Sequence, residues 1–248
     1  NKAYNKSLEN KAIYLQNQWQ YAQATVVLAG RHEDYDSFGT HNTGSINLGY
    51  HFSPEQLVYV NAGTAFKAPD LNQLYGSSSS NPNLKPEESR SIEFGSKHQL
   101  GALKFNTAFF NNQIKNLITY GSTAPYALSN LQEARSKGFE LAASVQQNGL
   151  FANISGSYIS AQDKASKKNL DRRPRHTLTL STGYQTSQWG FGAELLAKGH
   201  TQDFAGRIGG YAVANANAYW QIIPSTKLRL NIDNITDKTY SGGWVDSG

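Results

Sequence analysis

The sequence has no cysteine, no methionine and no long apolar run. Its 248 residues therefore contain no disulfide bridge, no catalytic thiol and no cysteine-ligated metal. No stretch approaches the roughly 18 consecutive apolar residues of a membrane-spanning helix, which excludes a helical membrane protein. Because the chain lacks a start methionine, we expect a processed or truncated piece whose export signal lay upstream.

The composition combines low hydrophobicity with many aromatic residues. Hydrophobic residues make up 38% of the chain and mean hydropathy is −0.56, yet 12% of residues are aromatic, with 14 Tyr, and Gly numbers 22. A disordered chain would be as polar but less aromatic. A β-barrel with an apolar outer face and a watery lumen has this balance, because half of each strand is polar.

Alternating apolar and polar residues predict many strands. In Lys227–Asp233, Leu228, Leu230 and Ile232 alternate with charged and amide side chains. Such a polar face fits a wet lumen, and it also fits the exposed face of a soluble sheet. The pattern predicts twelve strands: 11–20, 24–33, 43–52, 57–66, 89–99, 103–118, 135–147, 150–162, 174–186, 189–201, 210–222 and 226–235. Most reach the nine to eleven residues or so that a tilted strand needs to cross a bilayer.

Short and long connections alternate between these strands. The short ones are Tyr21–Gln23, Ser53–Gln56, Gln99–Ala102, Gln147–Gly149, Thr186–Gln188 and Ile223–Ser225. The long ones are Asp34–Asn42, Asp70–Glu88, Gly121–Ala134, Asp163–Arg172 and Gln202–Gly209. In an up-and-down antiparallel sheet every second connection lies at the same rim. The pattern is typical of an outer-membrane barrel with short periplasmic turns and long extracellular loops.

The longest insert, Ala65–Arg90, has the sequence AFKAPDLNQLYGSSSSNPNLKPEESR. It resembles the signature segment of the TonB-dependent outer-membrane receptors, and NITDKTY near the end of the chain is similar to the motif before the last barrel strand of that family. The matching residues, expected to be structural, are Phe66, Lys67, Ala68, Pro69, Leu74, Asn81, Pro82, Leu84, Pro86, Glu87, Asn234, Asp237 and Tyr240. We expect the ends of the insert to pack the loop base and its tip, Gly76–Ser80, to be mobile.

Further segments resemble the cobalamin (vitamin B12) transporter branch of this family. They are DYDSFGTHNT (Asp34–Thr43), EARSKGFE (Glu133–Glu140) and RRPRH (Arg172–His176). The resemblance implies an all-β, antiparallel transmembrane β-barrel in the outer membrane of a Gram-negative bacterium. Residues 1–248 would supply about twelve of about 22 strands of that barrel domain, without the plug domain, the first strands or the last strand. We expect such an open segment neither to insert stably nor to transport by itself, and a self-contained twelve-strand barrel is the alternative.

The resemblance implies a receptor and active transporter, most similar to those for cobalamin. Its partners would be the ligand, the energy-coupling protein TonB acting through the plug, the lipid bilayer and lipopolysaccharide, with the receptor itself a monomer. A ferric-siderophore receptor of the same family is one alternative. A passive pore or adhesin-like barrel is another, and a soluble β-sandwich or lectin is a third.

Aromatic and polar side chains on the expected outer loops are the candidate ligand contacts. They are Asn72, Gln73, Tyr75, Tyr120, Tyr126, Arg172 and Arg207. Each of these positions is also compatible with a loop-packing or solvated side chain.

Two charged clusters have two interpretations each. His32–Asp36 (HEDYD) could hold a divalent cation or form a solvated acidic strand end. The related transporters use calcium to order extracellular loops, but the residues of that site have no match here, so no metal ligand or cofactor is assigned. The basic cluster, Lys164, Lys167, Lys168, Arg172, Arg173 and Arg175, could meet lipopolysaccharide phosphates or an anionic ligand, or it could be a solvated loop. No nucleic-acid-binding motif accompanies it.

The sequence offers no pattern for catalysis. Its 6 His residues lie on separate stretches, and nucleophile-elbow, HExxH and phosphate-binding glycine motifs are absent. We therefore expect a protein that is not an enzyme.

Overall fold

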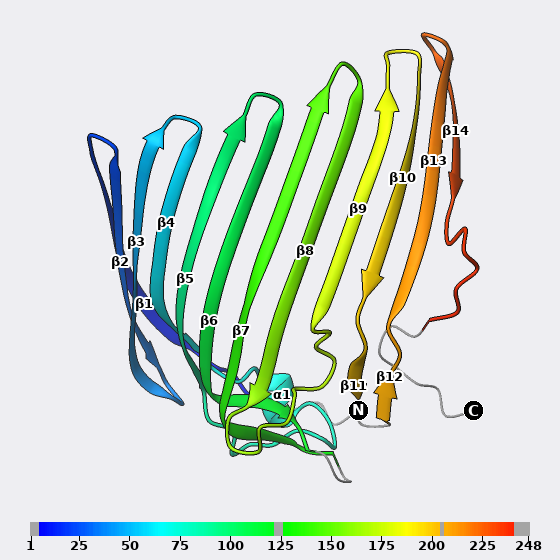
Figure 1. Ribbon diagram of the computed structural model, residues 1–248. Helices are drawn as coiled ribbons and strands as arrows, with labels where there is room; N and C mark the ends of the chain where they lie inside the picture. The colour runs from blue at the N-terminus through cyan, green and yellow to red at the C-terminus, as the bar shows by residue number, and fades with distance from the viewer. Residues whose placement is uncertain (1–4, 122–125, 204–205, 241–248) are drawn as a thin grey trace.

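The computed structural model describes residues 5–121, 126–203 and 206–240. They form one curved antiparallel sheet of 12 strands in sequence order, with a separate two-stranded hairpin, β11–β12 (Figure 1). The sheet strands are β1 (Asn10–Tyr21), β2 (Ala24–Tyr35), β3 (Gly39–Ser53), β4 (Gln56–Lys67), β5 (Glu87–Leu100), β6 (Leu103–Tyr120), β7 (Leu128–Gln147), β8 (Leu150–Asp163), β9 (His176–Gln185), β10 (Trp189–Lys198), β13 (Tyr211–Ile223) and β14 (Thr226–Ile232). The hairpin strands are β11 (Thr201–Asp203) and β12 (Gly206–Ile208), and the one short helix described is α1 (Leu71–Tyr75). No helix among the described residues is long and apolar enough to cross a membrane.

All twelve predicted strands are confirmed as the strands of the sheet, but some boundaries were wrong. The segment Gly121–Ala134 was predicted as a loop, whereas β6 and β7 stay paired out to Tyr120 and Leu128. Strand β10 ends at Lys198 rather than at residue 201, and the hairpin β11–β12 occupies most of the loop predicted at Gln202–Gly209. Residues 122–125 of the first loop and 204–205 of the second lie outside the described residues.

The two faces of the sheet differ in chemistry. Cross-strand register places Phe94, Phe109 and Phe139 directly opposite one another on β5, β6 and β7, all on one face. On the other face Asn61 lies opposite Glu93. Side chains of the apolar face remain open, with Phe109 55% exposed. A continuous exposed apolar wall of this kind is unfavourable in water and suits contact with lipid.

The two rims of the sheet also differ (Figure 1). At one rim the strands are joined by tight turns, for example at Asn148 and Gly149, whose φ values of 51° and 85° match the type I′ turn favoured in two-residue hairpins. At the other rim lie α1, the hairpin β11–β12 and the long connections. This arrangement confirms the predicted alternation of short turns and long loops, with one exception. Asp34–Asn42 was predicted as a long loop, whereas β2 and β3 stay paired out to Tyr35 and Gly39, so only residues 36–38 connect them.

The sheet does not close on itself within the described residues. Strands β1 and β14 each have a hydrogen-bonded neighbour on one side only, and every residue of both strands is exposed. In lipid each unpaired backbone group costs several kcal/mol, so a stable barrel requires both edges to be paired.

Candidate functional site

The long connection between β4 and β5 is an ordered layer at the loop rim. Its helix α1 is capped by Asp70, whose carboxylate accepts the Gln73 N–H at 2.8 Å, while the Gln73 side chain accepts the Asp70 N–H at 3.1 Å. This reciprocal capping box satisfies two backbone donors that a helix start leaves unpaired. The side chain of Gln73, which was predicted as a ligand contact, therefore forms a hydrogen bond within the loop.

A small hydrophobic core lies under this layer. Leu74, Leu84 and Leu128 are buried together, with Phe38 and Ile118 packed against them. These five residues come from α1, two loop segments, β6 and β7. Because the contacts join segments far apart in sequence, the loop rim has a packed interior of its own rather than a set of independent loops.

The family-motif residues hold the base of this layer. Phe66 stacks on the His41 ring with centroids 3.6 Å apart, and Pro69 is fully buried. Glu87 accepts the Ile118 N–H at 2.9 Å and lies 3.9 Å from the Lys67 ammonium group. Ala68 and Pro86 are partly buried beside them, and Pro82 is exposed.

The Gly76–Ser80 tip, predicted to be mobile, makes hydrogen bonds to two other segments in the structure. The Ser80 hydroxyl donates to the Asn72 carbonyl at 2.7 Å, and the Ser79 carbonyl accepts the Leu128 N–H at 2.7 Å. Asn81 continues the connection by donating from its side chain to the Leu128 carbonyl at 2.9 Å. The tip is thus tied to the start of β7, a contact that no local sequence pattern indicates.

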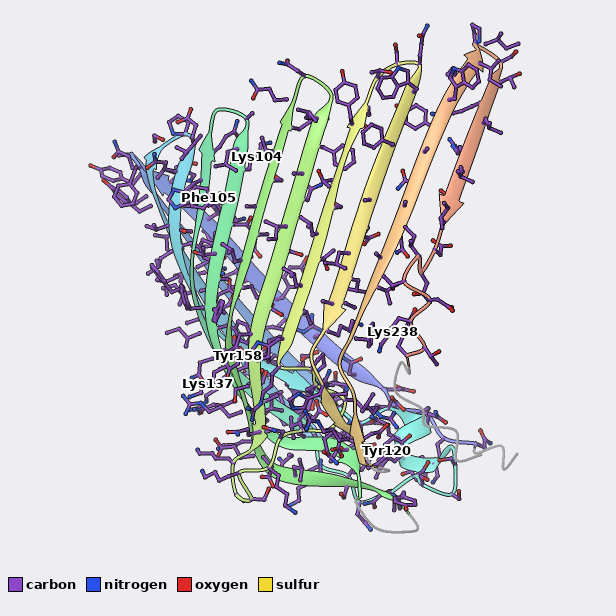
Figure 2. The ribbon with its side chains drawn as sticks, turned by 45° about the vertical axis from the view of Figure 1, so that its right-hand side comes forward. Lys104, Phe105, Tyr120, Lys137, Tyr158 and Lys238 are labelled. Carbon is purple, nitrogen blue, oxygen red and sulfur yellow. The ribbon has the colours of Figure 1, made fainter. Side chains whose placement is uncertain are left out.

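Three exposed tyrosines lie at this loop rim. Tyr75, Tyr120 and Tyr126 are 37%, 50% and 48% exposed. Tyr75 ends α1, Tyr120 ends β6 and appears at the loop rim in Figure 2, and Tyr126 precedes β7 with a φ of 53°. The structure therefore brings three of the predicted ligand residues to the same rim as Asn72 and Gln73.

The other two predicted ligand residues belong to a second group around the hairpin β11–β12. Arg172 donates from Nε to the Asp203 carboxylate at 3.1 Å, and its N–H donates to the Gln202 carbonyl at 2.7 Å. Arg207 lies on β12 and is exposed. Burial, together with the neighbouring Asp203 carboxylate, raises the pKa of Asp171 above the ordinary aspartate value. Arg172 is thus a bridge between two loops, and Arg207 is the more accessible cation.

The basic cluster is partly neutralised by its surroundings. Lys164 pairs with Glu133 at 2.7 Å, Arg172 pairs with Asp203, and Arg175 donates to the Asn169 side chain at 2.7 Å. Lys167, Lys168 and Arg173 are exposed on the same loop. They form no salt bridge within the part of the chain that the structure describes.

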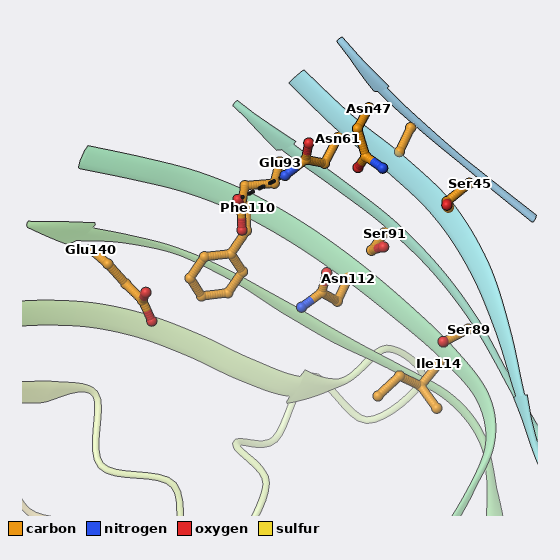
Figure 3. A pocket seen from close by; sticks show the side chains of 12 residues that line it. Ser45, Asn47, Asn61, Ser89, Ser91, Glu93, Phe110, Asn112, Ile114 and Glu140 are labelled. Atoms are coloured by element: carbon orange, nitrogen blue, oxygen red, sulfur yellow. Dashed lines mark hydrogen bonds between the residues drawn. The ribbon is translucent and has the colours of Figure 1, made fainter. Parts of the chain in front are cut away.

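Below the loops, the inner face of the sheet carries a polar hollow that the sequence interpretation did not single out. It has a volume of about 530 Å³ and is shown in Figure 3. Its lining comes from strands β3 to β7 and consists of Ser45, Asn47, Asn61, Ala62, Gly63, Ser89, Ser91, Glu93, Phe110, Asn112, Ile114 and Glu140. The Asn61 side chain donates to Glu93 at 3.3 Å. The inward positions of the alternating pattern were the sequence signal that could have identified this wall.

Two carboxylates in this hollow lack a basic partner. Within the described part of the chain, neither Glu93 nor Glu140 forms a salt bridge. Charged side chains on a surface of this kind need water or a polar or cationic partner. The inner wall therefore suits a water-filled lumen or contact with a polar domain.

The HEDYD segment does not gather into one metal site. Along β2 the alternation sends His32 and Asp34 to one face of the sheet and Glu33 to the other, where Glu33 pairs with Arg31. No group of three or more His, Asp or Glu side chains with the arrangement of a metal site is present among the described residues.

The NITDKTY segment after β14 forms a compact turn. Asn234, with a φ of 52°, accepts the Lys238 N–H on its side-chain oxygen at 3.0 Å, and Asp237 also has a positive φ of 47°. Tyr240 stacks on Tyr211 with ring centroids 4.4 Å apart. Asn234 tolerates this left-handed backbone and bonds it locally, which explains an asparagine at this point of the motif.

Comparison with known proteins agrees with the barrel-like sheet that the structure shows. Residues 1–235 match the family model described as "TonB dependent receptor-like, beta-barrel". The chain is 31% identical to the vitamin B12 transporter of Photobacterium profundum over 243 residues, which is 94% of this chain and 40% of that protein. It is 30% identical to the vitamin B12 transporter of Vibrio vulnificus over 244 residues, covering 97% of this chain and 40% of that protein. The chain thus spans about 40% of the length of these relatives.

The solved structures that share this fold are named for substrates other than vitamin B12. The chain superposes on the copper transporter OprC with a TM-score of 0.81 at 18% identity, covering 94% of this chain and 44% of that one. It superposes on a mutant of the ferric enterobactin receptor of Pseudomonas aeruginosa with a TM-score of 0.79 at 20% identity, covering 94% and 41%. The siderophore receptor PirA of Acinetobacter baumannii gives 0.80 at 18% identity, covering 93% and 42%. At these identities the likeness concerns the fold alone.

Proposed function

The chain belongs to the TonB-dependent receptor β-barrel family, and from that premise we propose that it forms the loop-bearing wall of an outer-membrane receptor that imports cobalamin. The ordered loop rim carries this proposal. A packed layer with exposed Tyr75, Tyr120 and Tyr126 presents large, rigid surfaces to a ligand at low entropic cost. The two relatives named as vitamin B12 transporters favour cobalamin as that ligand.

The polar inner wall fits the transport step of the proposed function, in which the ligand passes through the barrel. Glu93 and Glu140 face a space in which a plug domain or water must satisfy them. Energy from TonB would act on the plug and open a path along this wall, in the outer membrane of a Gram-negative bacterium. The proposed role is transport rather than catalysis.

A ferric-siderophore receptor is the second candidate function. The solved structures of the same fold include receptors named for ferric enterobactin and other siderophores. The loop rim also carries exposed cations, Arg207 among them, that could pair with an anionic iron chelate.

Equilibrium binding to the intact receptor distinguishes the candidates. We expect saturable binding of cyanocobalamin that weakens at least ten-fold in Tyr75→Ala combined with Tyr120→Ala, since alanine substitution of an aromatic anchor costs about 2 kcal/mol. Tyr21→Ala is the matched control, because Tyr21 is 85% exposed at the opposite rim.

Other outcomes separate the alternatives. Saturable binding of a ferric catecholate but not of cyanocobalamin would transfer the proposal to the siderophore receptor. Absence of saturable binding, together with ohmic conductance through the purified protein, would instead indicate a passive pore.

A further inference from the structure

Cations gather at one place on the outward, apolar face of the sheet. Arg90 on β5 and Arg135 on β7 both lie opposite Gln113 of β6, so the three side chains form one cross-strand row. Lys137 lies one outward position further from the loops, opposite Asn111. Because outward positions alternate along each strand, Arg90, Arg135 and Lys137 all project from the face that carries Phe109.

These cations lie where the apolar wall ends. Ile92 and Phe139 occupy the next outward positions below Arg90 and Lys137, and both are about half-exposed. Figure 2 shows Lys137 near Tyr158, which lies opposite Phe139 on the same face. If the apolar rows face lipid tails, the cationic row is at the level of the lipid headgroups.

The protein itself does not neutralise this charge. Across the described part of the chain, none of Arg90, Arg135 and Lys137 forms a salt bridge. Arg135 donates only its Nε to the Asn111 side chain, at 2.7 Å. The nearest acidic residues in register, Glu88 and Glu133, lie one row closer to the loops, where each faces Lys115 across a strand pair and Glu133 also binds Lys164.

Cations of the outward face are concentrated in this part of the wall. Within the described sheet strands β2 to β10 and β13, the register and the alternation place Arg90, Lys115, Arg135 and Lys137 outward and send the other lysines and arginines of those strands inward. On the edge strand β1, Lys11 also lies outward, opposite Asp34. The outward positions of β9, β10 and β13 in register with Leu141 of β7 are Leu178, Ala197 and Ala212. The charge is therefore a local feature of β5 to β7 and not a ring around the wall.

We propose that Arg90, Arg135 and Lys137 bind the headgroup of an outer-leaflet lipid that carries two or more phosphates. Arg90 and Arg135 are two strand spacings apart, or about 9.6 Å, which lets each guanidinium reach a separate phosphate. Arginine pairs with phosphate through two parallel hydrogen bonds. Lys137 adds a third positive charge, and Gln113 supplies an amide donor between the arginines. The acyl chains of the same lipid would lie along Ile92, Phe109 and Phe139.

The test compares two sets of substitutions in the intact protein, purified from outer membranes in mild detergent. The wall variant combines Arg90→Gln, Arg135→Gln and Lys137→Gln. The control combines Lys167→Gln, Lys168→Gln and Arg173→Gln, which removes the same charge from the neighbouring loop. Native mass spectrometry counts the bound lipid after incubation with a bisphosphorylated glycolipid, with phosphatidylglycerol or with inorganic phosphate.

We expect wild type and control to retain the bisphosphorylated glycolipid. The wall variant should retain at least ten-fold less bound glycolipid than wild type. Single substitutions are expected to lose part of the binding, and unchanged heat-modifiable migration in gels verifies that each variant is folded. Equal retention by wall variant and wild type, or loss in the loop control alone, would overturn the proposal. Equal wild-type retention of phosphatidylglycerol, or competition by inorganic phosphate at similar concentration, would overturn the assignment to a multiply phosphorylated lipid.

Discussion

The two rims of the sheet are stabilised in different ways. At the short-turn rim, two- or three-residue connections are fixed by backbone geometry, as at Asn148–Gly149, and by local side-chain bonds such as that from the Tyr219 hydroxyl to the Thr186 carbonyl at 2.6 Å. At the loop rim, Leu74, Leu84 and Leu128 form a separate core. The comparison suggests that the loop rim can loosen or change without disturbing the strands that carry it.

The largest expected effect comes from removing the loop core. Leu84→Ala should destabilise the loop layer by about 2–5 kcal/mol, because Leu84 is 4% exposed and its loss leaves a cavity. We expect faster hydrogen exchange in residues 70–86 and weaker ligand binding, with the sheet itself unchanged.

Leu150→Ala is the matched control at the short-turn rim, where Leu150 is 61% exposed. An equal loss of loop protection in both variants, or global unfolding of the sheet by Leu84→Ala, would contradict the separation of the two rims.

A smaller effect is expected from the helix cap. Asp70→Ala removes the acceptor of the Gln73 N–H and should cost about 1 kcal/mol. Exchange of the amides of α1 should rise about five-fold, while those of the Asn148–Gly149 turn stay unchanged. A cap that contributes nothing to loop order would leave both sets of amides at their wild-type rates.

The smallest expected effect is a pH dependence confined to the loop rim. Because the pKa of Asp171 is raised in the folded state, the folded protein binds the proton more tightly than the unfolded chain. Stability of the hairpin β11–β12 should therefore increase as pH falls from neutral through the raised pKa, with the gain complete below the unfolded value of about 3.9.

Asp171→Asn should remove this dependence, and hydrogen exchange measured across that pH range provides the readout. A hairpin that loosens steadily on acidification in the wild type would show that another group dominates.

The strands were predictable because their signal is local, whereas the loop layer depends on distant contacts. Leu228, Leu230 and Ile232 alternate within one short segment, and each turn residue acts on its immediate neighbours. The contacts that tie the Gly76–Ser80 tip to β7 could not be predicted from local sequence. The hydrogen bond from the adjoining Asn81, for example, reaches Leu128, 47 residues further along the chain.

Among the candidate site residues, one local signal was available in principle. Asp70 and Gln73 have the spacing of a capping box, which would have indicated a helix start inside the insert. The strands of the hairpin β11–β12 have three residues each, too few to show a period. Which of Tyr75, Tyr120 and Arg207 share a surface depends on how separate loops pack, and no single segment encodes that.

The pairing order of the sheet has a consequence for how the chain folds. Consecutive sheet strands pair in sequence order from β1 to β10, so each strand pairs with the strand that precedes it in the chain. Closing a two-residue turn is entropically inexpensive and fast, whereas the β4–β5 connection must close a much longer loop. We therefore expect hairpins such as β7–β8 to form early and to join one another in a zipper, with the β4–β5 junction among the slow steps.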